Sequence, residues 1–370
     1  MANQHSVNRL SEPSDRNPLG RPGATDRPKS PRAPPKSEGE IALVSAGSPS
    51  IWRFLSRRAG YALALIFAVI VFNFILIHAA PGDPVTLMTG ESGSPESYQQ
   101  LRARYGLDRP ILEQLLRYLA TVARGNLGFS FTFQRPVTEV IVQRVPATLL
   151  LTGTAILLSS VLGVLLGTLA ALRQRTLLDT AITAASVAGY SIPIFWLAQM
   201  LLIIFALRLR WLPAVGMSSL YEHVDFAGRV VDVLRHLVLP ATSLTIFYLT
   251  LVTRLTRVKM IENLHAQYVV TARAKGLPPL VVIFRHALPN AIPPVITVIG
   301  YSFGLMFAGS VLTETVFAWP GLGRLIFDAV FSRDYPLLMA IFIFISVSVV
   351  LFNVVADLLH GLIDPRIRYG

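Results

Sequence analysis

The sequence contains no cysteine and few charged residues. Of its 370 residues, 15% are charged and 53% are hydrophobic, and the mean hydropathy is +0.55. Without cysteine the chain has no disulfide, no thiolate metal ligand and no cysteine nucleophile. So low a charge content at this hydropathy is atypical of a soluble globular domain and predicts a protein that crosses a membrane several times.

Motifs for nucleotide hydrolysis and for common enzyme chemistries are also missing. There is no G-x-x-x-x-G-K-[ST] run to hold a triphosphate, no G-x-S-x-G elbow and no H-E-x-x-H pair. Histidines such as His78, His236, His265 and His286 fit membrane-edge or loop positions better than ligand positions. We therefore expect no catalytic residue and no metal site in this chain, which disfavours an intramembrane enzyme.

The net charge of +12 comes from Lys and Arg residues that lie between apolar runs. Binding of nucleic acid needs such residues gathered on one face of a folded domain, so we expect no nucleic-acid partner. Residues 1–50 contain eight prolines and too little apolar surface to offset the ordering entropy of a packed core. We predict a disordered cytoplasmic tail here, and disfavour a lipid-binding basic motif because acidic residues are interspersed.

Six long stretches contain no Lys, Arg, Asp or Glu. The first, residues 59–82, is long enough to cross a hydrocarbon core about 30 Å thick at about 1.5 Å per residue. A signal peptide is the competing interpretation, since Ala79 and Ala80 are small, but the apolar region is too long. Five further windows complete the prediction of an all-α polytopic membrane protein with six transmembrane helices: 146–171, 180–207, 237–253, 287–313 and 336–356.

The basic residues predict the orientation. With the N-terminus inside, cytoplasmic segments hold 20 of the 33 Lys and Arg residues and the opposite side holds 13. Seven of those 13 lie in one long outer segment, which counts little under the positive-inside rule, so we predict N-in and C-in. That extracytoplasmic segment, residues 81–145, has apolar residues at helical spacing with Gly and Pro at the breaks, which predicts a small helical cap.

The energy source is expected to lie in another subunit. Ion-driven carriers usually place ionisable residues inside the membrane, whereas the six windows contain no acidic or basic side chain. Together with the missing triphosphate-binding run, this favours energy delivered by a partner. A stand-alone channel or an ion-driven carrier is the alternative from a different class.

The inner segment between the fourth and fifth windows carries the most informative pattern. Leu264, Tyr268 and Ala272 recur at i, i+4 and i+8, which predicts one shared helical face. Ala272 and Ala274 are small enough for close docking of helices. Gly276 can adopt the left-handed conformation that ends a helix.

Pro278 and Pro279 follow that glycine and prevent the helix from continuing. We expect a short cytoplasmic helix that turns back sharply into the fifth span and can lie in a groove of a partner. An ordinary solvated loop is the alternative.

The segment 270–289 resembles the signature of binding-protein-dependent ABC importer permeases, in which E-A-A, three residues and Gly are followed nine residues later by I-x-L-P. The match rests on Ala272, Gly276, Leu288 and Pro289. The glutamate and the isoleucine of the signature are absent here, while its spacing is present.

Other stretches, in order along residues 51–370, are similar to the first permease of the dipeptide, oligopeptide, nickel and glutathione importer group. The large outer segment after the first span also favours this permease over its sister subunit. The similar stretches are HAAPGDP (78–84), LRARYGLDRP (101–110), GNLGFSF (125–131), RPVTEVIVQRVPATLLL (135–151), SIPIFWLA (191–198), WLPAVGM (211–217), VLTETVFAWPGLGRL (311–325) and the terminal DPRIRYG.

The resemblance implies a type I ABC importer permease fold over residues 51–370, in the cytoplasmic (inner) membrane. It implies a second homologous permease, two ATPase subunits that bind ATP and Mg, an extracytoplasmic solute-binding protein and surrounding lipid, with no cofactor in this chain. Its implied activity is alternating-access movement of di- and oligopeptides, or of nickel chelates or glutathione.

The resemblance also implies a coupling segment, residues 258–289, that contacts the ATPases. Its expected contact residues are Tyr268, Val270, Thr271, Ala272, Arg273, Ala274, Lys275, Gly276, Leu277, Arg285, His286, Leu288 and Pro289. A second set could line the pathway or form a gate: Tyr190, Ser191, Pro193, Trp319, Gly321 and Gly323. The alternatives are a packing kink at the proline and an ordinary interfacial turn at the tryptophan.

Overall fold

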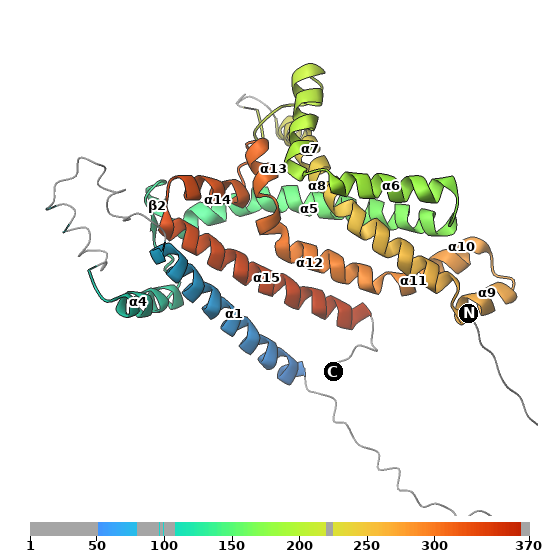
Figure 1. The fold of residues 1–370 in the computed structure, drawn as a ribbon, viewed down its shortest axis with the longest axis horizontal. Helices are drawn as coiled ribbons and strands as arrows, with labels where there is room; N and C mark the ends of the chain where they lie inside the picture. The colour runs from blue at the N-terminus through green and yellow to red at the C-terminus, as the bar shows by residue number, and fades with distance from the viewer. Residues whose placement is uncertain (1–50, 80–95, 97–98, 100–107, 220–224, 364–370) are drawn as a thin grey trace, which may run out of the picture. The chain divides into compact units, whose positions relative to one another are not determined.

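The computed structural model describes residues 51–79, 96, 99, 108–219 and 225–363, so the predicted tail lies outside the described residues. Helices dominate the described part (Figure 1). A two-stranded antiparallel hairpin pairs β1 (Phe129–Ser130) with β2 (Arg135–Pro136). The helices are α1 (Ile51–Ala79), α4 (Ile111–Ala123), α5 (Val137–Leu172), α6 (Leu177–Ser191), α7 (Ile194–Leu201), the π-helix η1 (Leu202–Arg208), α8 (Phe226–Leu264), α9 (Gln267–Ala274), α10 (Pro279–Val281), the π-helix η2 (Val282–Ala287), α11 (Leu288–Ala291), α12 (Pro293–Gly309), α13 (Val311–Val316), α14 (Leu322–Phe331) and α15 (Tyr335–Ile363).

Within the described residues, three helices are long and apolar enough to cross a membrane, namely α5, α8 and the Tyr335–Val355 part of α15. Two further stretches are long and apolar enough only when two bent halves are taken together. In one, α6 is followed by α7 and η1; in the other, the run from α10 to α11 is followed by α12. Residues Gly60–Leu76 of α1 form a shorter apolar helix. These six elements correspond in order to the six predicted windows.

The third window, 180–207, is broken at Pro193, the position at which the sequence indicated a helix break or a kink. The chain bends by 98° between α6 and the α7–η1 run. Pro193 has no N–H to donate and disfavours helical geometry in the residue before it, and Ile192 is accordingly extended, with φ −81° and ψ 125°. The bend is therefore encoded locally, whereas its size depends on what each half packs against.

Most of residues 81–107 of the predicted outer segment lie outside the described residues, and the described stretch 108–145 is only partly helical. α4 agrees with the predicted cap, but residues 129–136 form the hairpin, and the stretch that follows is the first part of α5. α5 runs through Pro146 without a break. Buried Val137, Val140 and Ile141 pack this outer part of α5 against α14 and α15, and that packing outweighs the local tendency of proline to interrupt a helix.

The hairpin is tied to the start of α15 by a buried carboxylate. Asp334 accepts hydrogen bonds from the Ser130 hydroxyl at 2.5 Å and from the Thr132 N–H at 3.0 Å. Its other oxygen accepts the Leu337 N–H at 3.2 Å, in the first turn of α15. One side chain thus holds the hairpin at the outer end of the last span.

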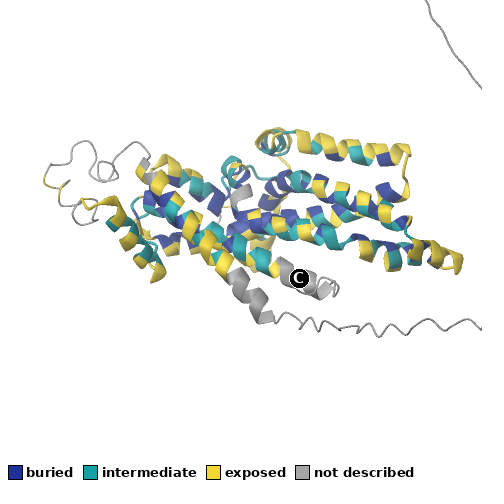
Figure 2. Ribbon diagram, turned by 60° about the horizontal axis from the view of Figure 1, so that its bottom comes forward, coloured by how far each residue is buried: buried dark blue, intermediate teal, exposed yellow. Residues whose placement is uncertain are grey.

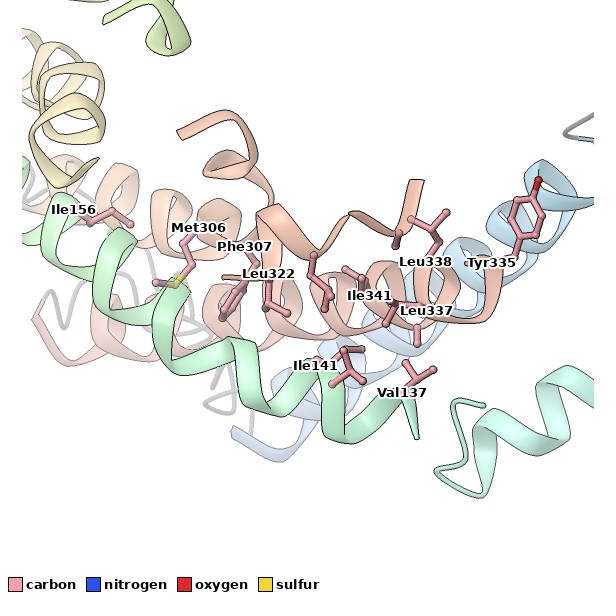
Figure 3. Packing of buried hydrophobic residues seen from close by; sticks show 14 residues of the cluster. Val137, Ile141, Ile156, Met306, Phe307, Leu322, Tyr335, Leu337, Leu338 and Ile341 are labelled. Atoms are coloured by element: carbon pink, nitrogen blue, oxygen red, sulfur yellow. The ribbon is translucent and has the colours of Figure 1, made fainter. Parts of the chain in front are cut away.

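The larger apolar core joins α5 with α12, α14 and α15 (Figure 3). Ile141 of α5 and Ile341 of α15 are both 2% exposed or less, and Met306 and Phe307 of α12 lie in the same cluster. Many apolar side chains face outward instead, and exposed positions, drawn yellow, alternate with buried and half-buried ones along the helices in Figure 2. Such a surface suits contact with lipid or with other helices rather than with water.

α5 and α8 pack with their backbones in close contact. Gly163 and Gly167 lie one turn apart on the face of α5 that meets α8. A Cβ on Gly163 would stand 2.6 Å from Cγ1 of Val252, and one on Gly167 would stand 2.6 Å from the carbonyl oxygen of Thr253. Small residues at this spacing let two membrane helices approach closely, and here the approach requires glycine.

We predict that Gly167→Ala destabilises the protein, because the added methyl group would overlap the α8 backbone. Overpacking of this kind costs about 1–3 kcal/mol of unfolding free energy. Gly153→Ala on the same helix is the matched control, since a Cβ there meets nothing within 4 Å. Thermal unfolding of the purified chain in detergent should show a lower midpoint for the first variant alone, and equal midpoints would contradict the proposed contact.

Candidate functional site

The inner segment between α8 and α12 forms a short helix with a sharp return. α8 ends at Leu264, and α9 runs over Gln267–Ala274. Gly276 has φ +77°, and its N–H donates to the carbonyl oxygen of Arg273 at 2.9 Å. The prediction of a short helix ended by a left-handed glycine is confirmed.

The predicted face of this helix is wrong in part. α8 and α9 are separated by a turn, so Leu264, Tyr268 and Ala272 do not follow one continuous helix. Val269 and Ala272 form the buried face, with 0% and 5% exposure, while Tyr268 is 40% exposed. The turn reorients α9, and side chains three residues apart, rather than four, now meet the core.

An apolar cluster fixes α9 to the ends of the membrane helices. It contains buried residues of α5, α8, α9, η2 and α11, among them Ala171, Met260, Val269 and Ala287. Within this cluster α9 contacts mainly η2 and the end of α8. Residues of α5 and α11 complete the same cluster.

Tyr268 is anchored at the edge of α9. Its hydroxyl donates a hydrogen bond to the side-chain oxygen of Asn263 at the end of α8. Partial burial raises the pKa of Tyr268, which keeps the hydroxyl protonated as a donor.

Most of the predicted coupling residues are on the surface. Ala272 is buried, and His286 and Leu288 are half-buried. The exposed members are Tyr268, Val270, Thr271, Arg273, Ala274, Lys275, Gly276, Leu277, Arg285 and Pro289. Two large apolar side chains that the sequence analysis did not select, Leu280 and Phe284, are exposed beside them, at 67% and 57%.

The first three pathway candidates lie at the bend between α6 and α7. Tyr190 is 57% exposed and its ring stacks on Phe247 of α8, with centroids 5.4 Å apart. The Ser191 hydroxyl donates to the carbonyl oxygen of Val187 at 2.9 Å, within its own helix. Pro193 caps the start of α7.

A groove of about 470 Å³ with apolar walls lies beside this bend, between α5, α6 and α8. The lining does not include the three predicted residues. It consists mainly of small and aliphatic side chains: Leu166, Ala181, Ile182, Ala185, Ser186, Gly189, Ile246 and Leu249.

The other three candidates are packed inside the protein. Trp319 is fully buried, and its indole N–H donates to the carbonyl oxygen of Ala147 at 2.8 Å. The interpretation of Trp319 as an interfacial anchor is therefore wrong. Ile194, next to Pro193, packs on the cluster that contains Trp319. The candidates near Pro193 and those near Trp319 therefore meet at the bend.

Gly321 and Gly323 make room for a buried carboxylate that the sequence analysis missed. Glu314 is 0% exposed, and a Cβ on Gly321 would overlap its carboxylate. A Cβ on Gly323 would stand 2.7 Å from the Cα of Val311. Both glycines are needed for close approach rather than for an open pathway.

Every oxygen of the Glu314 carboxylate has a donor. Oε1 accepts from the hydroxyls of Thr148 and Ser310 at 2.9 and 2.8 Å, and Oε2 accepts the N–H of Arg324 at 3.0 Å. The donated N–H belongs to the first turn of α14, where a negative charge is favourable. The one signal in the sequence was an isolated acidic residue directly after a charge-free window, before a glycine-rich turn.

A second missed feature joins α6 to α8. Asp179 accepts two hydrogen bonds from the Arg257 guanidinium, at 2.6 and 2.8 Å, and a third from the N–H of Arg175 at 3.0 Å. The pair is bidentate, which adds geometric specificity to the charge interaction. It holds the start of α6 against the inner half of α8.

Among the described residues, no group of three or more His, Cys, Asp or Glu side chains could hold a metal ion. The buried carboxylates described above are instead satisfied by hydroxyl, N–H and guanidinium donors.

Comparison with known proteins identifies the family. Residues 163–369 match the model of the binding-protein-dependent transport system inner membrane component, and residues 51–152 match the model of the N-terminal part of such membrane components. The solved structure described as inward facing conformations of the MetNI methionine ABC transporter is 16% identical, with a TM-score of 0.49, and covers 62% of this chain and 98% of its own.

Two relatives are similar over almost their whole length. The di/tripeptide transport system permease protein DppB of Pseudomonas aeruginosa is 41% identical over 331 residues, which cover 85% of this chain and 98% of that protein. The dipeptide transport system permease protein DppB of Escherichia coli is 38% identical over 335 residues, covering 86% and 99%. The chain thus belongs to the family of binding-protein-dependent transport system inner membrane components, and is a multi-pass protein of the inner membrane.

Proposed function

We propose that this chain is the permease subunit of an ATP-driven importer of di- and oligopeptides. The observation that carries the cargo class is the identity of 41% and 38% with proteins named as di/tripeptide and dipeptide permeases, over 98% and 99% of their length. The chain itself has a mechanical role and no catalytic one, and the ATP and Mg are bound by the partner ATPases.

The cytoplasmic contact is assigned to the coupling segment, residues 258–289. Apolar Val270, Leu277, Leu280 and Phe284 are exposed on α9 and the return that follows it. Basic side chains lie among them on the same exposed segment. A surface of this kind fits a groove of a partner that combines an apolar floor with acidic side chains.

Movement of the ATPases reaches the membrane through the cluster beneath α9. Val269 and Ala272 are buried in one cluster with residues of α8 and η2, which α9 contacts, and of α5 and α11, so α9 and those helix ends move together. Packed clusters change between discrete arrangements rather than deforming continuously. Closure of the ATPases on ATP would thus reorient the spans and switch access from one side to the other.

The assembly proposed here contains a second, homologous permease, two ATPases and an extracytoplasmic binding protein. The outward-facing apolar side chains on the long helices support contact with a second permease and with lipid. The pathway is assigned to the bend, with exposed Tyr190 as a lining residue beside Ser191 and Pro193. Trp319, with Gly321 and Gly323, is assigned instead to holding that bend against α5.

Uptake in proteoliposomes tests the function. With its partner permease, ATPases and binding protein, the chain should support uptake of a labelled dipeptide that requires ATP. Unlabelled di- and tripeptides should compete, whereas glutathione and a nickel chelate should not. Competition by glutathione or by the nickel chelate instead would indicate that this compound is the cargo. Uptake by the purified chain alone, driven by an ion gradient, would overturn the proposal.

Gly276→Trp tests the coupling segment. Any side chain at φ +77° strains the turn, and a bulky one would also project from the exposed contact surface, because nothing lies within 4 Å. We expect recovery of ATPase on the tagged permease to fall about tenfold, equivalent to about 1.4 kcal/mol of association free energy.

Gly125→Trp is the matched control for this experiment. Gly125 has φ +79° and also has nothing within 4 Å of an added Cβ, but it lies after α4 in the outer segment. Gly125→Trp introduces the same backbone strain as Gly276→Trp but lies away from the coupling segment, so recovery of ATPase should be unchanged. Normal attachment of the ATPases and normal coupling in Gly276→Trp would contradict the assignment of residues 258–289 as the coupling segment.

A further inference from the structure

The helix α4 in the outer segment has two chemically distinct faces. On one side, Glu113 forms ion pairs with Arg109 at 2.5 Å and with Arg117 at 3.1 Å. The Arg109 guanidinium holds the pKa of the Glu113 carboxyl below its usual value, so this side stays charged near neutral pH. Glu113, Arg117 and Thr121 recur every four residues, which gathers the polar groups on one stripe.

Another side of α4 carries large apolar side chains that are exposed. Ile111, Leu112 and Leu116 are 62%, 67% and 58% exposed, and no residue of α4 is buried. In Figure 2 this helix, at the left, is accordingly yellow and teal. Within the described residues, these three large apolar side chains thus remain mostly exposed.

Two attachments place α4 at the depth where the apolar part of α1 ends. Gln114 is hydrogen-bonded to His78 at 3.1 Å, and the Tyr118 ring stacks on Phe74, with centroids 6.2 Å apart. The apolar helix within α1 extends over residues Gly60–Leu76, so both contacts lie at its outer end. Beyond α4, the chain enters the hairpin that Asp334 ties to the start of α15.

α1 also carries exposed apolar side chains near its contact with α4. Phe72, Ile75 and Leu76 of α1 are 62%, 56% and 50% exposed close to the contact with α4. In a multi-pass protein of the inner membrane, apolar side chains exposed on such a helix suit contact with lipid. A helix attached at the end of α1 can bury its own apolar side chains in the same lipid.

We propose that α4 is an interfacial helix that lies in the extracytoplasmic surface of the membrane, with Ile111, Leu112 and Leu116 among the upper acyl chains. Arg117 and the capping residue Arg124 then stand at the level of the lipid phosphates. Helices with an apolar face and basic residues on the other bind membrane surfaces by burying the first and pairing the second with anionic headgroups. The helix anchors the outer segment in the plane of the membrane beside α1.

The absence of cysteine allows a direct measurement of depth, since a single introduced thiol is unique in the chain. Leu116→Cys is labelled with bimane in the apolar stripe, and Arg117→Cys is the matched control, about 100° around the same helix. The labelled chain is studied in its assembled transporter, in liposomes of phosphatidylethanolamine and phosphatidylglycerol. Quenching is compared between a lipid with a nitroxide near the top of its acyl chain and aqueous iodide.

We expect the lipid nitroxide to quench the probe at position 116 about three times as strongly as the probe at position 117, and iodide to show the reverse order. Equal quenching of both probes by iodide would place the helix in water and overturn the proposal. Protection of the Leu116→Cys probe from both quenchers would overturn it as well, because a protein segment, such as residues 80–107 or the binding protein, would then cover the stripe.

Discussion

The close contact between α5 and α8 is the constraint on which the rest of the structure depends. Between helices surrounded by lipid, burial of apolar surface gives little preference for one partner, and close packing of small residues must supply it. Gly163 and Gly167 remove the side chains that would separate the two backbones. α5 in turn supports the α14–α15 core at its outer end and the cluster under α9 at its inner end.

Buried carboxylates complete this frame at the helix ends. An unpaired buried charge is strongly unfavourable, so each of these carboxylates specifies the positions of its donors. Glu314 draws α13, α14 and α5 together, Asp334 joins the hairpin to α15, and Asp179 joins α6 to α8. These groups stabilise the arrangement of the helices.

Function is distributed over the two surfaces of this frame. On the inner side, α9 has an exposed face, to which we assign the proposed partner contact, and a buried face at Val269 and Ala272 that packs in the cluster with the helix ends. On the outer side, α4 is attached at the end of α1 through His78 and Phe74. Between them, the bend at Pro193 packs on the cluster of Trp319, so that the proposed pathway and the frame share side chains.

Local chemistry in the sequence determined the number and order of the apolar segments, the break at Pro193 and the left-handed turn at Gly276. These follow from charge-free length and from the backbone preferences of proline and glycine, which act over a few residues. Only the tertiary structure decided the 98° bend, the burial of Trp319 and the partners of Glu314. Each depends on contacts between segments far apart in the chain, such as the 166 residues that separate Thr148 from Glu314, and no local pattern specifies which distant donor a side chain will meet.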